Sequence, residues 1–200
     1  GRTTITYTYN ADGKLIKRER FGYVTDYIVE GNKIISETIE SNLTMYGTKT
    51  LDYIYSNDEL IGFLCNNVGY LFIKNSQNDI IGITDGEGNV VARYVYDAWG
   101  NHKVCNPDGT KNTSVTFIGN INPFRYRGYY YDVETNLFLV TSRYYSPELG
   151  RFIQPADVST LNPSSINGLN LYSYANNNPI GIAYSSSNVG FGASGGMINS

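Results

Sequence analysis

The stretch Tyr94-Val95-Tyr96-Asp97-Ala98-Trp99-Gly100-Asn101 carries the pattern from which the fold of this chain is predicted. Two tyrosines alternate with a branched residue, as in a β-strand whose successive side chains point to opposite faces. Asp97 follows, and its side chain can hydrogen-bond the backbone two residues on and start a turn. Gly100 can adopt the positive φ that a tight hairpin turn requires. The stretch therefore predicts a strand that ends in a hairpin.

The same order of parts recurs along the first hundred residues. Each copy has alternating aromatic or branched residues, then Asp or Asn, then Gly or Asn, and then a second short apolar run. The copies lie at residues 7–16, 27–35, 53–61, 72–81, 83–91 and 94–101. Because repeats of this kind decide an architecture, we expect consecutive hairpins that form one long antiparallel sheet. With no helical layer to cover it, such a sheet must curl or close to protect its edges.

Composition supports an all-β fold and excludes several functions. The 19 Tyr and 21 Gly suit pleated surfaces and the turns between them. The net charge of −3 gives no basic footprint for nucleic acid, and no apolar run is long enough to span a membrane. The sequence leaves open whether Cys65 and Cys105 pair, although two unpaired small apolar residues are favoured. We expect neither a metal site nor a cofactor.

The character of the chain changes after the repeats. Residues 102–122 are predicted to be a loop with a weak strand at Thr113–Ile118. A continuous strand is predicted over Phe124–Asp132, with a returning strand over Leu137–Tyr145.

A turn at 146–150 is expected to lead into a last short strand at 151–154. One helical turn is expected within 164–174, before Ala175–Pro179 halts regular structure. After Ile180 the drift to Ser, Gly and Asn predicts a flexible tail or linker.

Three motifs in this second half carry a resemblance to a known family. They are Pro123-Phe124-Arg125-Tyr126-Arg127-Gly128-Tyr129-Tyr130-Tyr131-Asp132, Arg143-Tyr144-Tyr145-Ser146-Pro147-Glu148-Leu149-Gly150-Arg151-Phe152 and Asn170-Leu171-Tyr172-Ser173-Tyr174-Ala175-Asn176-Asn177-Asn178-Pro179. In order and spacing they resemble the repeat-associated core of bacterial Rhs proteins, and the hairpin units resemble the YD repeats of the same family. The motif residues to which the resemblance gives a structural role are Tyr96, Asp97, Gly100, Arg125, Tyr126, Gly128, Tyr131, Asp132, Arg143, Tyr144, Tyr145, Gly150, Arg151, Phe152, Tyr172, Tyr174, Asn178 and Pro179.

The resemblance implies a shell. Family members wind a β-strip into a hollow cocoon around a variable C-terminal toxin, and the core closes it. The implied divisions here are a YD-repeat strip at 1–101, a loop at 102–122, the core at 123–180, and a variable-region start or linker at 181–200.

The implied partners are the toxin module after Pro179 and further shell upstream, with an immunity protein or a secretion apparatus as additional candidates. The implied location is secreted or on the bacterial cell surface. We expect a structural casing and not an enzyme.

Two other functions stay open. Some relatives cut themselves with aspartates, and the matching residue here is Asp157, with Arg151 or Arg143 near enough to keep it ionised. However, the Asp-Pro-x-Gly-Leu pattern of those relatives is missing, because Val158 follows Asp157 and no aspartate follows Pro179. A carbohydrate-binding surface built on Trp99 and the tyrosines is the third hypothesis.

The arginines of the core have a simpler interpretation than ligand recognition. Arg125, Arg127, Arg143 and Arg151 alternate with aromatic residues. We expect them to stack on tyrosines and to pair with Asp132 or Glu148.

Overall fold

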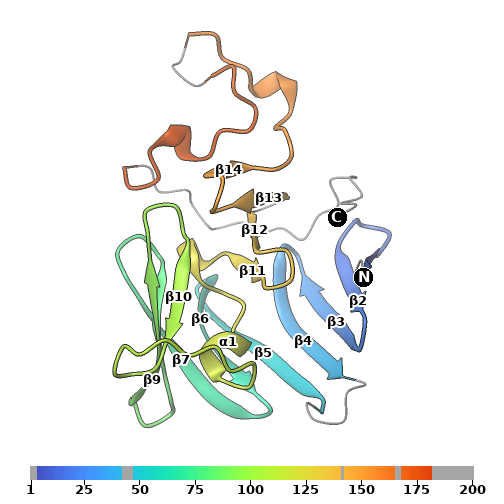
Figure 1. Ribbon diagram of the computed structural model, residues 1–200. Coiled ribbons are helices and arrows are strands. Elements are labelled where there is room, and N and C mark those ends of the chain that lie inside the picture. The colour runs from blue at the N-terminus through green and yellow to red at the C-terminus, as the bar shows by residue number, and fades with distance from the viewer. Residues whose placement is uncertain (1–3, 42–46, 141, 165–167, 182–200) are drawn as a thin grey trace.

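The computed structural model describes residues 4–41, 47–140, 142–164 and 168–181, and its regular secondary structure is almost entirely antiparallel β-sheet (Figure 1). A ten-stranded sheet, here called the strip, runs from β1 to β10 with every strand hydrogen-bonded to its neighbours in the sequence. Its strands are β1 (Ile5–Tyr9), β2 (Leu15–Arg20), β3 (Tyr23–Glu30), β4 (Lys33–Ser41), β5 (Lys49–Ser56), β6 (Glu59–Cys65), β7 (Val68–Lys74), β8 (Ile80–Thr84), β9 (Val90–Tyr96) and β10 (His102–Cys105). The predicted all-β fold of consecutive hairpins is confirmed.

The second half forms a smaller unit, here called the plug and defined as residues 123–180. It contains a four-stranded antiparallel sheet in the order β11-β12-β13-β14. The strands are β11 (Tyr130–Asp132), β12 (Leu137–Val140), β13 (Arg143–Ser146) and β14 (Arg151–Phe152). Figure 1 shows the strip curving around β11, with the remaining plug strands stacked above it.

Four hairpins of the strip turn at the same five-residue corner. In the corner that begins at Asp97, Oδ1 of Asp97 accepts hydrogen bonds from the amides of Trp99 and Asn101 at 2.9 and 3.0 Å. Gly100, the fourth residue, has a φ of +94°. The corners that begin at Asn10, Asn75 and Asp85 repeat both hydrogen bonds. The Tyr-Asp repeat is therefore a strand followed by a side-chain-capped turn.

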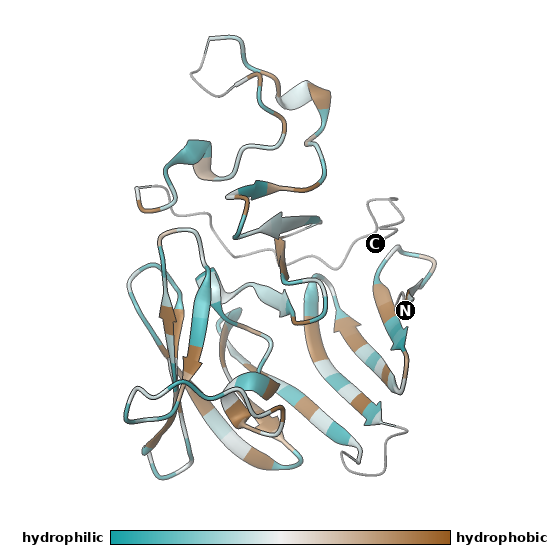
Figure 2. Cartoon of the chain, viewed as in Figure 1, coloured by the Kyte–Doolittle hydropathy of each residue, from teal (hydrophilic) through white to brown (hydrophobic). Residues whose placement is uncertain are grey.

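The concave face of the strip holds the main core. Alternate residues of its strands point inward, and Figure 2 shows the resulting bands of apolar and polar residues. Phe124, Tyr130 and Leu139 of the plug belong to the same buried cluster as the inward side chains of the strip. The ring of Phe124 meets that of Tyr53 edge-on, with centroids 4.8 Å apart. The plug thus completes the core of the strip.

A second buried cluster lies within the plug and contains only aromatic and small apolar residues. Tyr145 and Tyr174 lie with ring centroids 4.1 Å apart. The corner between β9 and β10 contacts this cluster directly, because the hydroxyl of Tyr126 donates to the carbonyl of Ala98 at 2.8 Å and that of Tyr145 to the carbonyl of Trp99 at 2.7 Å. The Tyr-Asp corner between β9 and β10 therefore also forms a contact surface for the plug.

Three predicted elements differ from the structure. Thr113–Ile118 is not a strand, because Lys111 makes the bridge to Cys105 and the chain then turns into the short helix α1 (Ile118–Ile121), which packs on the core. Phe124–Asp132 is not a continuous strand, since a 3₁₀ turn at Tyr126–Gly128 interrupts it and Arg127 has a φ of +55°.

The helical turn expected within 164–174 is absent from the described residues of that range. Instead, 3₁₀ turns lie at Val158–Thr160 and Ala175–Asn177. The predicted tail after residue 181 lies outside the described residues. Because β10 pairs with β9, the strip extends to Cys105; the proposed boundaries at 101, 122 and 180 stay predictions.

Two smaller expectations concern the cysteines and the membrane. Cys65 and Cys105 are both free thiols. Over the ranges that the structure describes, no helix has the length and apolarity to cross a bilayer.

Candidate functional site at the contact between plug and strip

An ion cluster joins the plug to the first strands of the strip. Nη1 of Arg18 on β2 lies 3.1 Å from Oδ1 of Asp132 and 3.0 Å from Oε2 of Glu134. Arg20 adds a contact of 3.0 Å to Glu134, and the hydroxyl of Tyr7 donates to Asp132 at 3.2 Å. The side chains of Arg18, Asp132 and Glu134 are at most 11% exposed. The cluster therefore connects segments more than a hundred residues apart in a place that water hardly reaches.

The two carboxyl groups of this cluster titrate differently. Burial and a hydrogen bond to Asp132 raise the pKa of Glu134 to about 7. Burial acts in the same direction on Asp132, but the hydrogen bond from Glu134 and the charge of Arg18 hold the pKa of Asp132 below its ordinary value. Asp132 is therefore the ionised partner of Arg18, and Glu134 can carry a proton near neutral pH.

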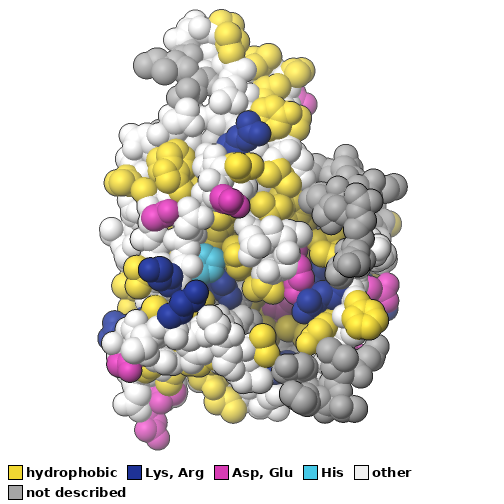
Figure 3. All heavy atoms as spheres, viewed as in Figure 1, with side chains coloured by type: hydrophobic (Ala, Val, Ile, Leu, Met, Phe, Trp, Pro, Cys, Tyr) yellow, Lys and Arg dark blue, Asp and Glu magenta, His cyan; other side chains and the backbone are white. Residues whose placement is uncertain are grey.

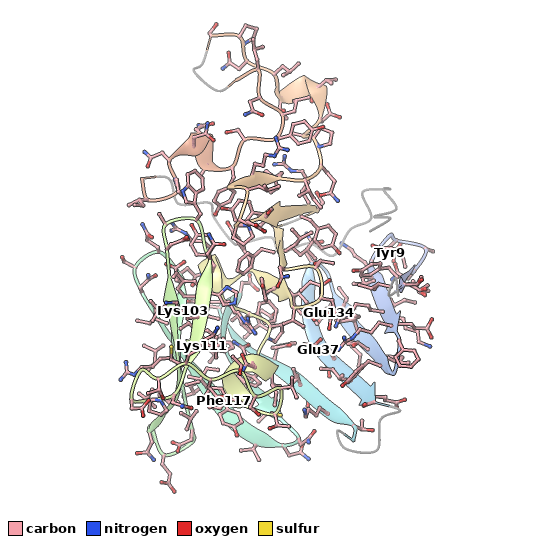
Figure 4. All side chains as sticks on the ribbon, viewed as in Figure 1. Tyr9, Glu37, Lys103, Lys111, Phe117 and Glu134 are labelled. Atoms are coloured by element: carbon pink, nitrogen blue, oxygen red, sulfur yellow. The ribbon has the colours of Figure 1, made fainter. Side chains whose placement is uncertain are left out.

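Deeper in the same contact, one buried carboxyl group accepts hydrogen bonds from two tyrosines. Glu37 on β4 is 1% exposed. It accepts from the hydroxyl of Tyr53 on β5 and, at 2.8 Å, from that of Tyr130 in the plug. Burial raises the pKa of Glu37 in spite of these bonds. Figure 4 shows Glu37 and Glu134 lying near one another where the strip faces the plug.

A third contact holds the chain where it leaves the plug. Arg127, only 2% exposed, lies beside Asp79 at the corner between β7 and β8. Its backbone amide donates to Oδ1 of Asp79 at 2.9 Å, and its guanidinium donates to the carbonyl of Pro179. Gln77, from the same corner, donates to the carbonyl of Ile180 at 2.9 Å. A corner of the strip thus fixes the position of Pro179 and Ile180.

His102, which is the single histidine of the chain, lies where β10 meets the plug, with its ring centroid 4.5 Å from that of Tyr131. Its Nε2 is 2.6 Å from Nη1 of Arg125, and its Nδ1 is 3.2 Å from the carbonyl of Gly100. Burial and the charge of Arg125 lower the pKa of His102 to about 4. The imidazole is therefore neutral at pH 7, with Nε2 accepting from Arg125 and Nδ1 donating to Gly100. Figure 3 shows it in cyan beside basic side chains.

Three of the four arginines of the core stack on tyrosines as expected, Arg143 stacks on a phenylalanine instead, and the ionic partners differ from those predicted. Arg125 lies over Tyr131, Arg127 over Tyr126, Arg143 over Phe152 and Arg151 over Tyr172. The predicted pairing with Asp132 is wrong, since Asp132 pairs with Arg18, and Arg127 pairs with Asp79. Among the described residues, none of these arginines forms an ion pair with Glu148.

The other motif residues of the core fill its interior or shape its turns. Tyr126, Tyr145, Phe152 and Tyr174 belong to the second buried cluster, while Gly128 and Gly150 adopt positive φ. Tyr144 packs against the main core, and Tyr131 packs on Phe138. Tyr172 lies under the guanidinium of Arg151, and Asn178 accepts from the amide of Gly181 at 3.0 Å.

The candidate catalytic residue lies away from these contacts. Asp157 is exposed and caps the 3₁₀ turn at Val158–Thr160 by accepting from the amide of Ser159 at 2.8 Å. Hydrogen bonds from Ser159 lower the pKa of Asp157. Trp99, the candidate sugar platform, packs on the second cluster, with its ring against Gly150.

Sequence reasoning missed the residues of the strip that receive the plug, namely Arg18, Glu37, Gln77 and Asp79. Arg18 lies in a run of mixed charge that is typical of a solvated strand. The alternation of β4 does place Glu37 on the same face as Ile39 and thus toward the core. A charged residue at an inward position is unusual, and this was the sequence signal that could have identified Glu37.

The relationship to known proteins agrees with this arrangement. A sequence model described as Teneurin YD-shell matches residues 1–180. The chain belongs to the teneurin YD-shell family. The match covers both the strip and the plug, and it confirms the Rhs and YD-repeat resemblance of the motifs.

Among curated relatives of this YD-shell chain, the tRNA3(Ser)-specific nuclease WapA of Bacillus spizizenii is 34% identical over 180 residues, and the tRNA nuclease WapA of Bacillus subtilis is 35% identical over 180 residues. Each match spans 88% of this chain and 7% of the relative. The double-stranded DNA deaminase toxin A of Burkholderia cenocepacia is 36% identical over 100 residues, which are 50% of this chain and 6% of that protein.

Among solved structures, the complex TcdB2-TccC3 without its hypervariable C-terminal region has the same fold. It aligns with a TM-score of 0.67 and 18% identity over 92% of this chain and 9% of its own. The Photorhabdus luminescens Tc holotoxin pore aligns with a TM-score of 0.63 and 18% identity over 97% of this chain and 9% of its own.

Lowering the pH from 7 to 4.5 is expected to destabilise the YD-shell chain relative to a His102→Gln variant. The pKa of His102 is about 4 in the folded chain, against an ordinary 6.5, so below pH 6.5 the unfolded state binds a proton that the folded state does not. Glu134 acts in the opposite direction, because its raised pKa stabilises the fold as the pH falls through 7.

Glu134 and the other acidic groups are common to both proteins, so their effects cancel in the comparison. The measurement is the difference between the two free energies of unfolding, from urea denaturation at several pH values. Parallel pH profiles would show that His102 is not held neutral by the fold.

Proposed function

We propose that this chain is the closing section of a shell that encloses a toxin module located after it in the same polypeptide. The observation that carries the proposal is the seating of the plug on the concave face of the strip. Phe124 and Tyr130 enter the core of the strip, and Asp132 pairs with Arg18. A curved sheet covered on its concave side by its own C-terminal unit is the shape that a closed end requires.

The exit of the chain supports the same role. Arg127 and Gln77 bind the carbonyls of Pro179 and Ile180, so whatever follows residue 181 starts from a fixed point beside the β7–β8 corner. Relatives named as tRNA nucleases and as a DNA deaminase toxin support this role, because sequences similar to this chain occur within proteins named for those activities. The activity of the enclosed module would be separate from that of the shell.

The other edge of the strip supports continuation of the shell upstream. Within the described residues, β1 is the first strand of the sheet order and pairs only with β2. Its free backbone groups are suited to pairing with a further hairpin. We propose that upstream YD repeats occupy this edge and that the assembled shell acts in secretion or at the cell surface, where an immunity protein or a secretion apparatus would meet it.

Protection from proteolysis tests the enclosure. In the long protein that contains this chain and a downstream module, thermolysin is expected to leave the module intact while it digests the same module expressed alone. An Arg18→Met variant, which weakens the seating of the plug, is expected to expose the module. If the module in the intact shell is digested as fast as the free module, enclosure is wrong.

Self-cleavage through Asp157 stays a separate prediction with its own test. A cut near Pro179 that disappears in an Asp157→Ala variant would support it. The exposed position of Asp157 and its role as a turn cap agree better with an uncut product. An uncut product would leave the shell function unaffected.

A further inference from the structure

A cavity of about 320 Å³ lies between the strip and the plug. Strands β2 to β5 form one wall of the cavity, residues 113–121 form a second, and residues of the plug form the third. Its aromatic walls come from Tyr23, Tyr130 and Tyr131. A cavity of this size has room for a small ligand or for one or two side chains of a peptide.

The charges that line the cavity are unbalanced. Arg18, Arg20, Lys49 and Arg125 face two carboxyl groups, those of Glu37 and Glu134. Arg18 and Arg20 are matched by Glu134 and, outside the lining, by Asp132. Among the described residues, no carboxylate lies within ion-pair distance of Lys49 or Arg125.

Arg125 makes this imbalance costly. It is 3% exposed, and its Nε and Nη2 donate to the carbonyls of Asn122 and Asn120, each at 3.2 Å. Its Nη1 is bound to the neutral His102. The guanidinium is therefore hydrogen-bonded but has no counter-charge, and a desolvated cation without an anion is destabilising. An anion in the cavity would supply that counter-charge.

The titratable groups beside the cavity do not supply the missing counter-charge of Arg125. Both carboxyl oxygens of Glu37 accept hydrogen bonds from tyrosine hydroxyls, and burial raises the pKa of this group. Burial and the charge of Arg125 lower the pKa of the adjacent His102, so the imidazole is neutral at pH 7 and carries no counter-charge either. The lining therefore selects against cations and favours an anion whose remaining atoms can pack on tyrosine rings.

We propose that this cavity binds the carboxylate of an acidic side chain from the polypeptide that the shell encloses, with Arg125 and Lys49 as its cationic partners. The inference rests on the proposed function, because the cavity lies on the concave side, where the enclosed polypeptide would reach it. The planar guanidinium matches the geometry of a carboxylate. Ile39 and Val133 in the lining offer apolar contact for the methylene groups of a glutamate.

The single histidine provides a direct probe of occupancy. The Cε1–H resonance of His102 in the 200-residue chain would be followed by NMR at pH 7 during titration with N-acetyl-glutamate methylamide. The matched neutral probe is N-acetyl-glutamine methylamide. The glutamate probe is expected to shift the resonance to saturation and to bind at least about tenfold more tightly, as the loss of a charge-assisted contact predicts.

Equal binding of the two probes would overturn the proposal. Inorganic phosphate serves as a third probe, and tighter binding of phosphate than of the glutamate probe would also overturn it, because the site would then be one for a free anion.

Variants separate the cavity from the general charge of the surface. Lys49→Met removes one unmatched cation from the lining and is expected to weaken the glutamate probe about tenfold. Lys103→Met removes the same charge from an exposed position on β10 that does not line the cavity, and it is expected to leave binding unchanged. Equal effects of the two variants on binding of the glutamate probe would contradict the assignment of Lys49 to the binding site.

Arg125→Gln is the stronger test and is expected to abolish binding of the glutamate probe. Lys49→Met keeps the proposal falsifiable if Arg125→Gln fails to fold. Probe binding is measured without a downstream module, so its outcome does not depend on enclosure. Failure of the cavity proposal can therefore be distinguished from failure of the proposed shell function.

Discussion

An Arg18→Met variant is expected to lose about 3–5 kcal/mol of stability, because it removes one partner of a buried ion cluster. Methionine keeps the apolar stem of the arginine but leaves the ionised Asp132 without its partner at 3.1 Å. Glu134 would lose the same guanidinium and keep only Arg20. The plug would be affected most, since this cluster joins it to β2. Urea denaturation, followed by the fluorescence of Trp99 beside the plug, measures the loss.

Lys17→Met is the matched control. Lys17 precedes Arg18 on the same strand and pairs with Glu19 at 3.3 Å, but the two side chains are 38% and 46% exposed. Removing an exposed pair is expected to change the free energy of unfolding by less than about 1 kcal/mol. A loss in the Arg18 variant no greater than that in the Lys17 variant would show that the cluster does not hold the plug.

A Gly100→Ala variant is expected to lose about 3–5 kcal/mol, from backbone strain and overpacking together. Gly100 has a φ of +94°, which alanine rarely adopts. A Cβ atom there would also lie 2.7 Å from Cδ1 of Tyr126. Because Tyr126 is 2% exposed and lies in the second cluster, its ring has little room to move.

Gly88→Ala separates these two causes. Gly88 occupies the same position in the neighbouring corner, with a φ of +87°, but a Cβ atom there would meet nothing within 4 Å. The Gly88→Ala variant is expected to lose only the stability that the backbone strain costs, about 1–2 kcal/mol. The difference between the two free energies of unfolding measures the contact of the corner with the plug. Equal losses would mean that this contact contributes nothing.

The strip was predictable because its information is local. Asp97 and Gly100 specify a corner within five residues, and the alternation of tyrosines before the corner specifies the strand. The sheet order then follows from the chain order, since each strand pairs with the next. None of these steps needs knowledge of a distant residue.

The plug and its seat were less predictable because they depend on distant contacts. The alternation of Phe124–Asp132 indicates a strand, yet Arg127 adopts a φ of +55°. Its amide and guanidinium lie beside Asp79, 48 residues earlier, and its guanidinium also bonds Pro179, 52 residues later. Arg18 likewise looks like a solvated residue until the plug covers it. Local patterns carry no sign of these pairings.

The path of the chain after Pro179 tests the account most directly. In a longer polypeptide that carries a module after this chain, a cryo-electron microscopy map would show residues 123–180 against the concave face of the strip, with Arg127 bound to the carbonyl of Pro179. We predict that density continues from Ile180 into the space that the shell encloses. Density that leaves Ile180 toward the outer face of the sheet, with the downstream module outside, would contradict the enclosure.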